Sequence, residues 1–306
     1  MEVIEVPSAT QLKQIQKDLG EDEDRMKSLE NVLFQWLDSQ SHMSNEYDKN
    51  VVRYFLRGCK YDMEKAKKHL ECHFAARSIY PELFCDRSVS SEETLRALEM
   101  AYIAPLYKLT EDGCRISVFK FNETEAAKID MTAVLKLFFM IYDIVFRCPH
   151  PVVAEIIIFD YNGCSPGHLL KFLSSCTKLI KILRKAYAIR LLSVHVVNAP
   201  ATFDRTVTVV KPMLHPKIRE RIVLHPTNES LYEHFGDNLP SNYGGKSISL
   251  EETAAKYKKL LKENSKWLEE SEYMKMNGSI PKDCQDNLYF KDGLGVEGSF
   301  RKLELD

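Results

Sequence analysis

The spacing of apolar residues divides the chain into two regions. In the first hundred residues, apolar positions recur every three or four residues within 26–37, 51–56 and 63–74. This period is typical of amphipathic helices. Because no strand pattern separates these stretches, the sequence predicts a small helical bundle. The helical spacing of apolar residues ends at 81–93, where a proline and a serine-rich turn interrupt it.

From residue 114 onward, we expect strands and helices to alternate. Short apolar runs have the pattern of strands at 115–122, 152–160, 189–197 and 220–225. Longer periodic segments between them have the pattern of helices at 132–146 and 167–187. This order predicts an α/β fold whose parallel strands are joined by right-handed crossovers.

Two segments nearer the C-terminus have a weaker pattern. Residues 206–211 are rich in β-branched side chains, which favour a strand. Their position between two strands favours a helix, and we predict a helix over 202–211. The charged, periodic stretch 250–270 predicts another helix, and the polar tail after it is expected to wrap the surface.

The helix expected at 132–146 is apolar on nearly every side, although Lys136 and Asp143 interrupt it. Such a helix is either covered on several sides or lines an apolar cavity. The pattern leaves both possibilities open. The apolar stretch of 13 residues is too short to span a bilayer.

Composition changes this picture little. The net charge of −2 over 306 residues gives no overall attraction to nucleic acid or to an anionic membrane. Eight cysteines with irregular spacing and no C-x-x-C pair are expected to be reduced thiols in the cytosol. Basic residues gather locally along 178–185 and 217–221. These clusters indicate either an anionic surface as partner or an ordinary solvated helix face.

One motif resembles the nucleophile elbow of a hydrolase. Residues 163–167, GCSPG, match G-x-S-x-G, in which Ser165 would attack an ester. The next residue is Pro166, which has no N–H to contribute to an oxyanion hole. We therefore expect Ser165 to cap the following helix and predict no enzymatic activity.

Two further motifs suggest binding sites that their surroundings do not support. The sequence GGKS at 244–247 resembles the end of a phosphate-binding loop, but Pro240 stands where that loop needs a glycine. His69, Cys72 and His73 have a spacing that can chelate a metal on one helix face. No fourth ligand completes a recognised zinc spacing, so we expect no metal site.

Four longer segments carry a family resemblance. In order, FLRGCKYDMEKAKKHL, IIIFDYNGCSPGH, VHVVNAPATFDRTVTVVKPML and LPSNYGG lie between residues 25 and 260. They resemble the CRAL-TRIO lipid-binding proteins, and look most like the branch that contains the α-tocopherol transfer protein and the cellular retinaldehyde-binding protein. The resemblance implies that LPSNYGG is a structural turn: Pro240 makes it rigid, Gly244 and Gly245 allow φ > 0, and Tyr243 packs it down.

The resemblance also implies an architecture. A helical N-terminal domain (1–90) would precede a CRAL-TRIO domain (91–270), and a tail (271–306) would follow. In the CRAL-TRIO domain a mostly parallel sheet would form the floor of a closed hydrophobic pocket covered by helices. The helix 202–211 would be a gate that opens at a membrane.

By position, the resemblance assigns two groups of residues. Ligand contacts would be Leu137, Met140, Ile144, Phe172, Leu179, Ile182, Leu183, Tyr187, Val194, Phe203 and Val207. Phosphoinositide contacts would be Arg57, Arg190, Lys217 and Arg221. Cys59 stands where the family has a further arginine, and Ile189 stands where the phosphatidylinositol-exchange branch has an acid. The second departure argues against phosphatidylinositol as the carried ligand.

These implications predict a non-enzymatic intracellular carrier. It would hold one small lipophile (a retinoid, tocopherol, carotenoid or other isoprenoid), without a cofactor, and transfer it between membranes through phosphoinositide docking. It would be cytoplasmic, with peripheral membrane association and no nucleic-acid partner. The alternative is a phosphoinositide-binding signalling or scaffold protein in which the pocket lipid is structural.

Overall fold

The computed structural model describes residues 4–199 and 219–288. Within them a five-stranded sheet has the strand order β1-β2-β3-β4-β5. β1 is antiparallel to β2, and the other neighbouring strands are parallel. The strands are β1 (Ala101–Leu109), β2 (Arg115–Phe121), β3 (Glu155–Asp160), β4 (Leu191–Val197) and β5 (Ile222–His225).

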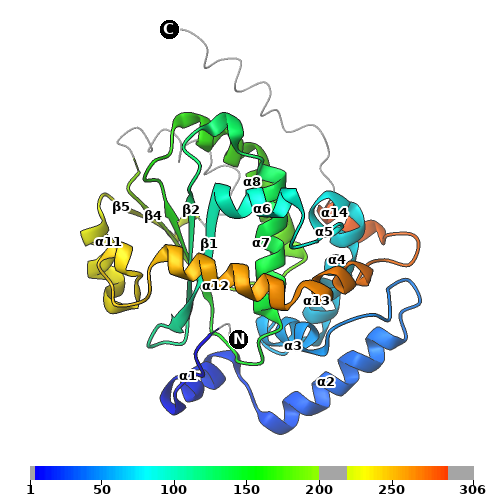
Figure 1. Ribbon diagram of the computed structural model, residues 1–306. Helices are drawn as coiled ribbons and strands as arrows, with labels where there is room; N and C mark the ends of the chain where they lie inside the picture. Colours follow the sequence, from blue (N-terminus) through cyan, green and yellow to red (C-terminus); the bar gives the residue numbers. More distant parts are fainter. Residues whose placement is uncertain (1–3, 200–218, 289–306) are drawn as a thin grey trace.

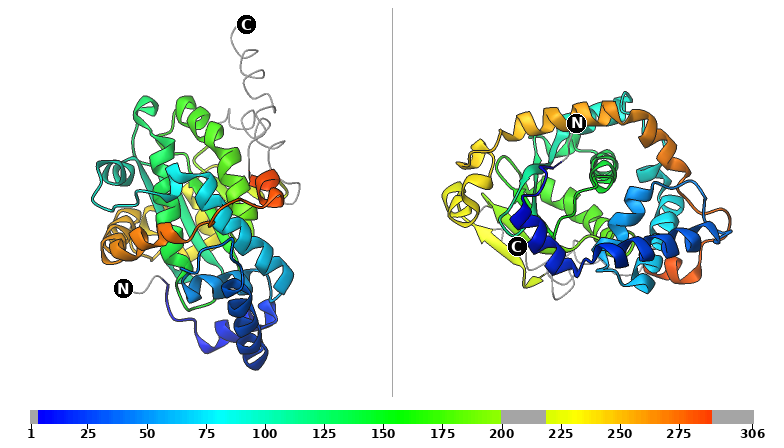
Figure 2. Two further views of the ribbon diagram at one scale, coloured as in Figure 1. Left: turned by 90° about the vertical axis from the view of Figure 1, so that its right-hand side faces the viewer. Right: turned by 90° about the horizontal axis from the view of Figure 1, so that it is seen from below.

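Helices lie on both sides of this sheet and beyond one end of it. In Figure 1, α7 lies to the right of the sheet and α11 to its left, while the N-terminal helices gather below and to the right. Figure 2 shows α12, in orange, running along the outside of the molecule. The helices are α1 (Ala9–Leu19), α2 (Glu23–Asp38), α3 (Lys49–Gly58), α4 (Met63–Ile79), α5 (Pro81–Phe84), α6 (Glu92–Met100), α7 (Met131–Phe146), α8 (Pro166–Lys185), α11 (Asn228–Phe235), α12 (Leu250–Glu263), α13 (Ser265–Glu270) and α14 (Lys282–Leu288).

The α/β architecture predicted from the sequence is confirmed, with three differences. β1 was missed because Pro105 interrupts its pattern, and an edge strand tolerates proline since one side of it needs no ladder partner. The N-terminal part contains α1, α5 and α6 besides the three predicted helices. The helix predicted at 250–270 is divided at Asn264 into α12 and α13. The predicted helix 202–211 lies outside the described residues.

α7 is the central helix of the core. It packs against α6, α5, α8, α12 and α3, so nearly every side chain from Met131 to Phe146 is buried. Burial on all sides explains why its sequence is apolar all round. Two charged residues of this helix are buried: Lys136, which pairs with Glu93 at 2.6 Å, and Asp143, whose side chain is only 3% exposed.

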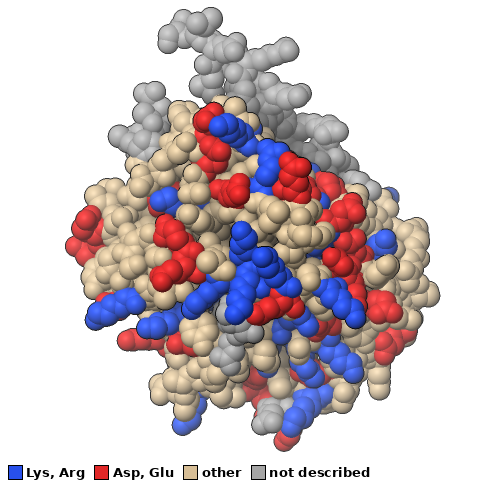
Figure 3. Space-filling model, viewed as in Figure 1, with Lys and Arg blue, Asp and Glu red and all other residues tan. Residues whose placement is uncertain are grey.

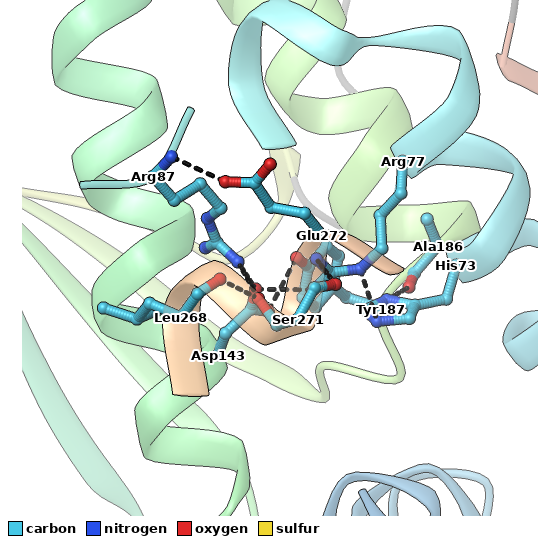
Figure 4. Close-up of polar contacts among 9 residues, drawn as sticks. All are labelled: His73, Arg77, Arg87, Asp143, Ala186, Tyr187, Leu268, Ser271 and Glu272. Carbon is cyan, nitrogen blue, oxygen red and sulfur yellow. Dashed lines mark hydrogen bonds and ion pairs between the residues drawn. The ribbon is translucent and has the colours of Figure 1, made fainter. Parts of the chain in front are cut away.

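Two arginines neutralise Asp143 inside the core. Its Oδ2 atom lies 2.5 Å from Arg77 Nη2 and 2.8 Å from Arg87 Nη1, and Tyr187 donates its hydroxyl proton to Oδ1 at 2.9 Å. Figure 4 shows these side chains converging from α4, the α5–α6 connection, α7 and the α8–β4 connection. Burial alone would raise the pKa of the Asp143 carboxyl, but the two guanidinium groups outweigh it and lower the pKa to about 2. The network therefore joins the N-terminal helices to the α/β domain through a charged contact.

His73 belongs to the same network as a neutral side chain. Its Nδ1–H donates to the Ala186 carbonyl at 3.0 Å, and its Nε2 accepts from Arg77 Nε at 3.2 Å. Burial, and then the positive charge of Arg77, lower the pKa of His73 to about 3. In the folded protein His73 therefore stays unprotonated, whereas in the unfolded chain it takes up a proton near pH 6.5.

We expect this histidine to lower the free energy of unfolding as the pH falls from 7 to 5. A depressed native pKa contributes stability above the unfolded pKa, and that stability is lost as the pH drops below it. For His73 the loss at pH 5 is about 2 kcal/mol. Denaturant titrations at both pH values measure it. His73→Gln, which can donate and accept without ionising, should lose less stability between them, and an equal loss would contradict the assignment.

The LPSNYGG segment forms a tight turn after the short helix η3 (Gly236–Asn238). The Tyr243 hydroxyl donates to Asp160 Oδ2 at 2.9 Å and fastens the turn to the end of β3. Gly244 has φ +83°, a conformation that favours glycine. Gly245 has an ordinary φ, but any Cβ there would collide with the Leu239 carbonyl. Gly245 is therefore needed for close approach, not for a positive φ as expected.

Candidate functional site

A cavity of about 550 Å³ lies between the sheet and helices α7 and α8. Its wall is mainly apolar, and Phe159 and Phe172 meet there at 5.4 Å between ring centroids. A cavity of this size is typical of sites for one small organic molecule.

Alternate side chains of β3 form part of the floor of this cavity. Glu155, Ile157 and Phe159 alternate along the strand and line the cavity. Ile156 and Ile158 point to the opposite face, where they are 5% and 0% exposed. Alternate side chains of a strand point to opposite faces, so one apolar run serves both the cavity and the core.

The cavity is polar at one end. Glu155 begins β3, Arg190 precedes β4 and Arg221 precedes β5, and all three line the cavity. Because neighbouring strands are parallel, these residues lie together at the amino ends of the strands. The other end is formed by Phe159, Tyr161, Leu169 and Val196. From Glu155 to Tyr161 the chain advances by about 20 Å, so the cavity has one polar and one apolar end.

Arg115 neutralises the carboxylate at this polar end. Its guanidinium makes two contacts with Glu155, one of them from Nε to Oε2 at 3.2 Å. The side chains are only 2% and 1% exposed. Burial would lower the pKa of Arg115, but Glu155 outweighs it and holds the pKa above its ordinary value. Glu155 therefore lines the cavity with a carboxyl group that is already paired with the Arg115 guanidinium.

The structure divides the predicted ligand contacts into three groups. Phe172, Leu179, Leu183 and Val194 lie in the cavity wall; their contact with a ligand stays a prediction. Phe203 and Val207 lie outside the described residues. The remaining residues are buried at 0–3% exposure and do not line this cavity: Leu137, Met140, Ile144, Ile182 and Tyr187.

The last group needs a correction. On α7 it is Phe138 and Tyr142, four residues apart, that line the cavity. Leu137, Met140 and Ile144 follow another stripe of the same helix, which packs into the core. Because α7 is apolar all round, its sequence does not reveal which stripe faces the cavity. Tyr187 is held away by Asp143.

The predicted cationic residues have different surroundings. Arg190 and Arg221 line the cavity, where Arg190 Nη1 donates to the Val153 carbonyl at 2.9 Å and Arg221 Nη1 donates to the Leu191 carbonyl. Arg57 is 3.5 Å from Glu21 and donates to the Pro149 carbonyl at 2.8 Å. Its charge is thus partly compensated. Lys217 lies outside the described residues.

Both signs of charge are mixed on the one face of the molecule that Figure 3 shows. On the face that carries α6 and α12, Lys and Arg lie among Asp and Glu over most of the area, with one small cationic gathering near the middle (Figure 3). Lys178, part of the predicted basic cluster, is paired with Glu82 at 2.9 Å. Among the described helices, none is long and apolar enough to cross a membrane.

Ser165 is engaged in capping α8. Its Oγ and backbone N lie 2.9 and 3.1 Å from His168 Nδ1, and His168 Nε2 donates to the Glu123 carbonyl at 2.8 Å. The imidazole therefore accepts from Ser165 at the helix start, with Pro166 in the first turn. A capping box holds this serine, and Pro166 leaves no oxyanion donor after it.

The three residues with metal-chelating spacing have separate partners. Cys72 Sγ lies 3.2 Å from Cys284 Sγ, and His73 belongs to the Asp143 network. Burial lowers the pKa of His69, which lies near Lys185. Over residues 4–199 and 219–288, no group of three or more His, Cys, Asp or Glu side chains is arranged to hold a metal ion.

Two family models match the chain. Residues 99–245 match the CRAL/TRIO domain, and residues 22–94 match the Pinta-like UBA domain. The crystal structure of Sfh5 shares the fold, with a TM-score of 0.50 and 14% sequence identity over 81% of this chain and 99% of that one.

Similar proteins include alpha-tocopherol transfer protein-like from Mus musculus, 26% identical over 216 residues, or 69% of this chain and 62% of that protein. Clavesin-1 from Rattus norvegicus is 26% identical over 202 residues, or 65% of this chain and 57% of that protein. The chain thus spans less than two thirds of these relatives' length. The sheet and the cavity beside it both lie within residues 99–245, the part of the chain that matches the CRAL/TRIO domain.

Proposed function

We propose that this protein is a non-enzymatic carrier that binds one lipophilic molecule in the cavity and transfers it between membranes. The observation that carries the proposal is the cavity of about 550 Å³ with its mainly apolar wall. Burying apolar ligand surface there is favourable by roughly 25 cal/mol per Å². The name of the alpha-tocopherol transfer protein-like relatives supports this reading.

The polarity of the cavity suggests how the ligand lies. Glu155, Arg190 and Arg221 offer hydrogen-bond partners at one end, and Phe159 and Phe172 offer apolar surface along the wall. We expect an elongated lipophile with its one polar group at the amino ends of β3 to β5. A retinoid, a tocopherol or another isoprenoid alcohol has this form.

Transfer of labelled lipid between vesicles tests the proposal. Donor phosphatidylcholine vesicles would carry all-trans-retinol or α-tocopherol, and the full chain would be added with unlabelled acceptor vesicles. At least one probe should move ten times faster than it does without protein. A panel of such isoprenoids that all move at the spontaneous rate would contradict the carrier function.

We further propose that the cations at the polar end of the cavity dock the carrier on phosphoinositide-containing membranes from the cytoplasmic side. Arg190 and Arg221 line the polar end of the cavity, where each donates to a backbone carbonyl and neither forms an ion pair with another described residue. Lys217 precedes Arg221 by four residues. Docking there would bring the polar end of the cavity to the membrane.

Neutralising these cations should weaken membrane binding. Each charge near an anionic surface contributes about 1 kcal/mol, so Arg190→Ala, Lys217→Ala and Arg221→Ala together should reduce affinity roughly a hundredfold. Sedimentation with phosphoinositide liposomes at low and high salt measures this. Lys178→Ala is the matched control, because Glu82 already compensates that charge. Equal binding by the triple variant and the control would contradict the docking proposal.

The same two experiments distinguish the alternative function. A signalling or scaffold protein with a structural lipid would sediment with phosphoinositide liposomes, yet it would leave the transfer rate at its spontaneous value. The apolar cavity favours the carrier, because a scaffold does not need an internal volume of this size.

A further inference from the structure

The last described helix, α14, is fastened to α4 by three side-chain contacts. Lys68 Nζ lies 2.7 Å from Asp283 Oδ2, and the Tyr80 hydroxyl donates to the Leu288 carbonyl at 2.5 Å. Between them, Cys72 Sγ lies 3.2 Å from Cys284 Sγ. α14 also packs against α8, a wall of the cavity. These contacts join two parts of the chain that are 212 residues apart.

The two thiols are close and shielded. Each cysteine is 1% exposed, and the sulfur atoms need to approach by only about 1 Å to reach bonding distance. The two sulfur atoms are already in contact, so no other protein atom lies between them. The geometry is therefore suited to a bond between these sulfurs with little movement of α4 or α14.

Each thiol is placed to resolve oxidation of the other. A thiolate is the nucleophile in thiol oxidation, and either sulfur can donate in the hydrogen bond between them. Whichever sulfur is oxidised first therefore has the other thiol 3.2 Å away in the closed form.

We propose that Cys72 and Cys284 form a reversible disulfide when the protein meets a hydroperoxide, and that this bond fastens α14 to α4. One cysteine of the pair, as its thiolate, attacks one peroxide oxygen and breaks the O–O bond, which gives a sulfenic acid and releases hydroxide. The other thiol then displaces the hydroxyl group, which leaves as water when the S–S bond forms. Two thiols are oxidised and one hydroperoxide is reduced to two molecules of water when the oxidant is hydrogen peroxide. A dithiol reductant reverses the change.

Access to the buried pair depends on local opening. α14 has only seven residues, so it can separate from α4 without unfolding the sheet. Oxidant reaches the thiols in the open form, and the disulfide that forms on reclosing then prevents reopening. Since α14 contacts α8, the bond also restrains one wall of the cavity.

Peptide mapping of the full chain tests the disulfide. After treatment with hydrogen peroxide, two of the eight thiols should be lost. The mass should fall by about 2 Da, and the peptides containing residues 72 and 284 should be linked until dithiothreitol is added. Cys284→Ser should form no link. Cys59→Ser, which removes a cysteine from another helix end, should form it as the wild type does.

Thermal unfolding tests the fastening. A cross-link across so long a loop should raise the Tm of the oxidised wild type by about 5 °C or more, with no such rise in Cys284→Ser. The proposal is overturned if peroxide leaves both thiols free, if it oxidises them without a link, or if it links other cysteines. A link that forms with no change in Tm would overturn the fastening.

Discussion

Replacing Asp143 with alanine is expected to destabilise the protein by about 3–5 kcal/mol, because it leaves two buried guanidinium groups without a counter-charge. Arg77 and Arg87 are only 1% and 0% exposed at their side chains. Arg87 already has two nitrogen atoms, Nε and Nη2, that lack hydrogen-bond partners. The core therefore offers no substitute for the lost carboxylate. Urea unfolding at pH 7 measures the change.

A surface ion pair supplies the control for this result. Glu82→Ala removes the partner of Lys178, and those side chains are 39% and 36% exposed. Exposed pairs contribute about 0–1 kcal/mol. If Asp143→Ala costs no more than Glu82→Ala, the buried network does not hold the helical region to the α/β domain as described.

Filling the cavity from its floor should abolish ligand uptake. Val194 lies in the cavity wall on β4, opposite Ile157 of β3. In Val194→Trp the larger side chain would extend into empty space, so uptake should fall at least tenfold while the fold remains stable. Fluorescence titration with retinol or a similar polyene lipophile measures uptake, and circular dichroism checks the fold.

Ile182→Trp is the matched comparison. Ile182 is 0% exposed and lies in the core, not in the cavity wall. A larger side chain there should cost about 1–3 kcal/mol of stability through overpacking. If Ile182→Trp stays stable and loses uptake while Val194→Trp keeps it, the cavity has been assigned to the wrong side of α8.

How far the sequence predicts this structure depends on the kind of pattern. The parallel strands were predictable because each is a short apolar run bounded by helical periods. β1 was not, because Pro105 disguises an edge strand. The stripe of α7 that faces the cavity was also hidden, since a helix that is buried all round carries no directional signal.

The sequence contains one sign of the polar end of the cavity, a charged residue in an apolar strand, but only the structure explains it. Glu155 stands between apolar residues at the start of β3, and a buried carboxylate requires a partner. The partner is Arg115, which is directly opposite in the parallel register of β2 and β3. Register between distant strands is not readable from one sequence, so the pair and the orientation it suggests for the ligand appeared only in three dimensions.

The stoichiometry of bound lipophile is the most direct test of the carrier account. Native mass spectrometry would be applied to the full chain after incubation with vesicles that contain a mixed isoprenoid extract, followed by separation from the vesicles. We predict one lipophile bound to each wild-type chain and none to Val194→Trp. A wild-type chain that emerges empty, or a Val194→Trp chain that carries as much as the wild type, would contradict the account.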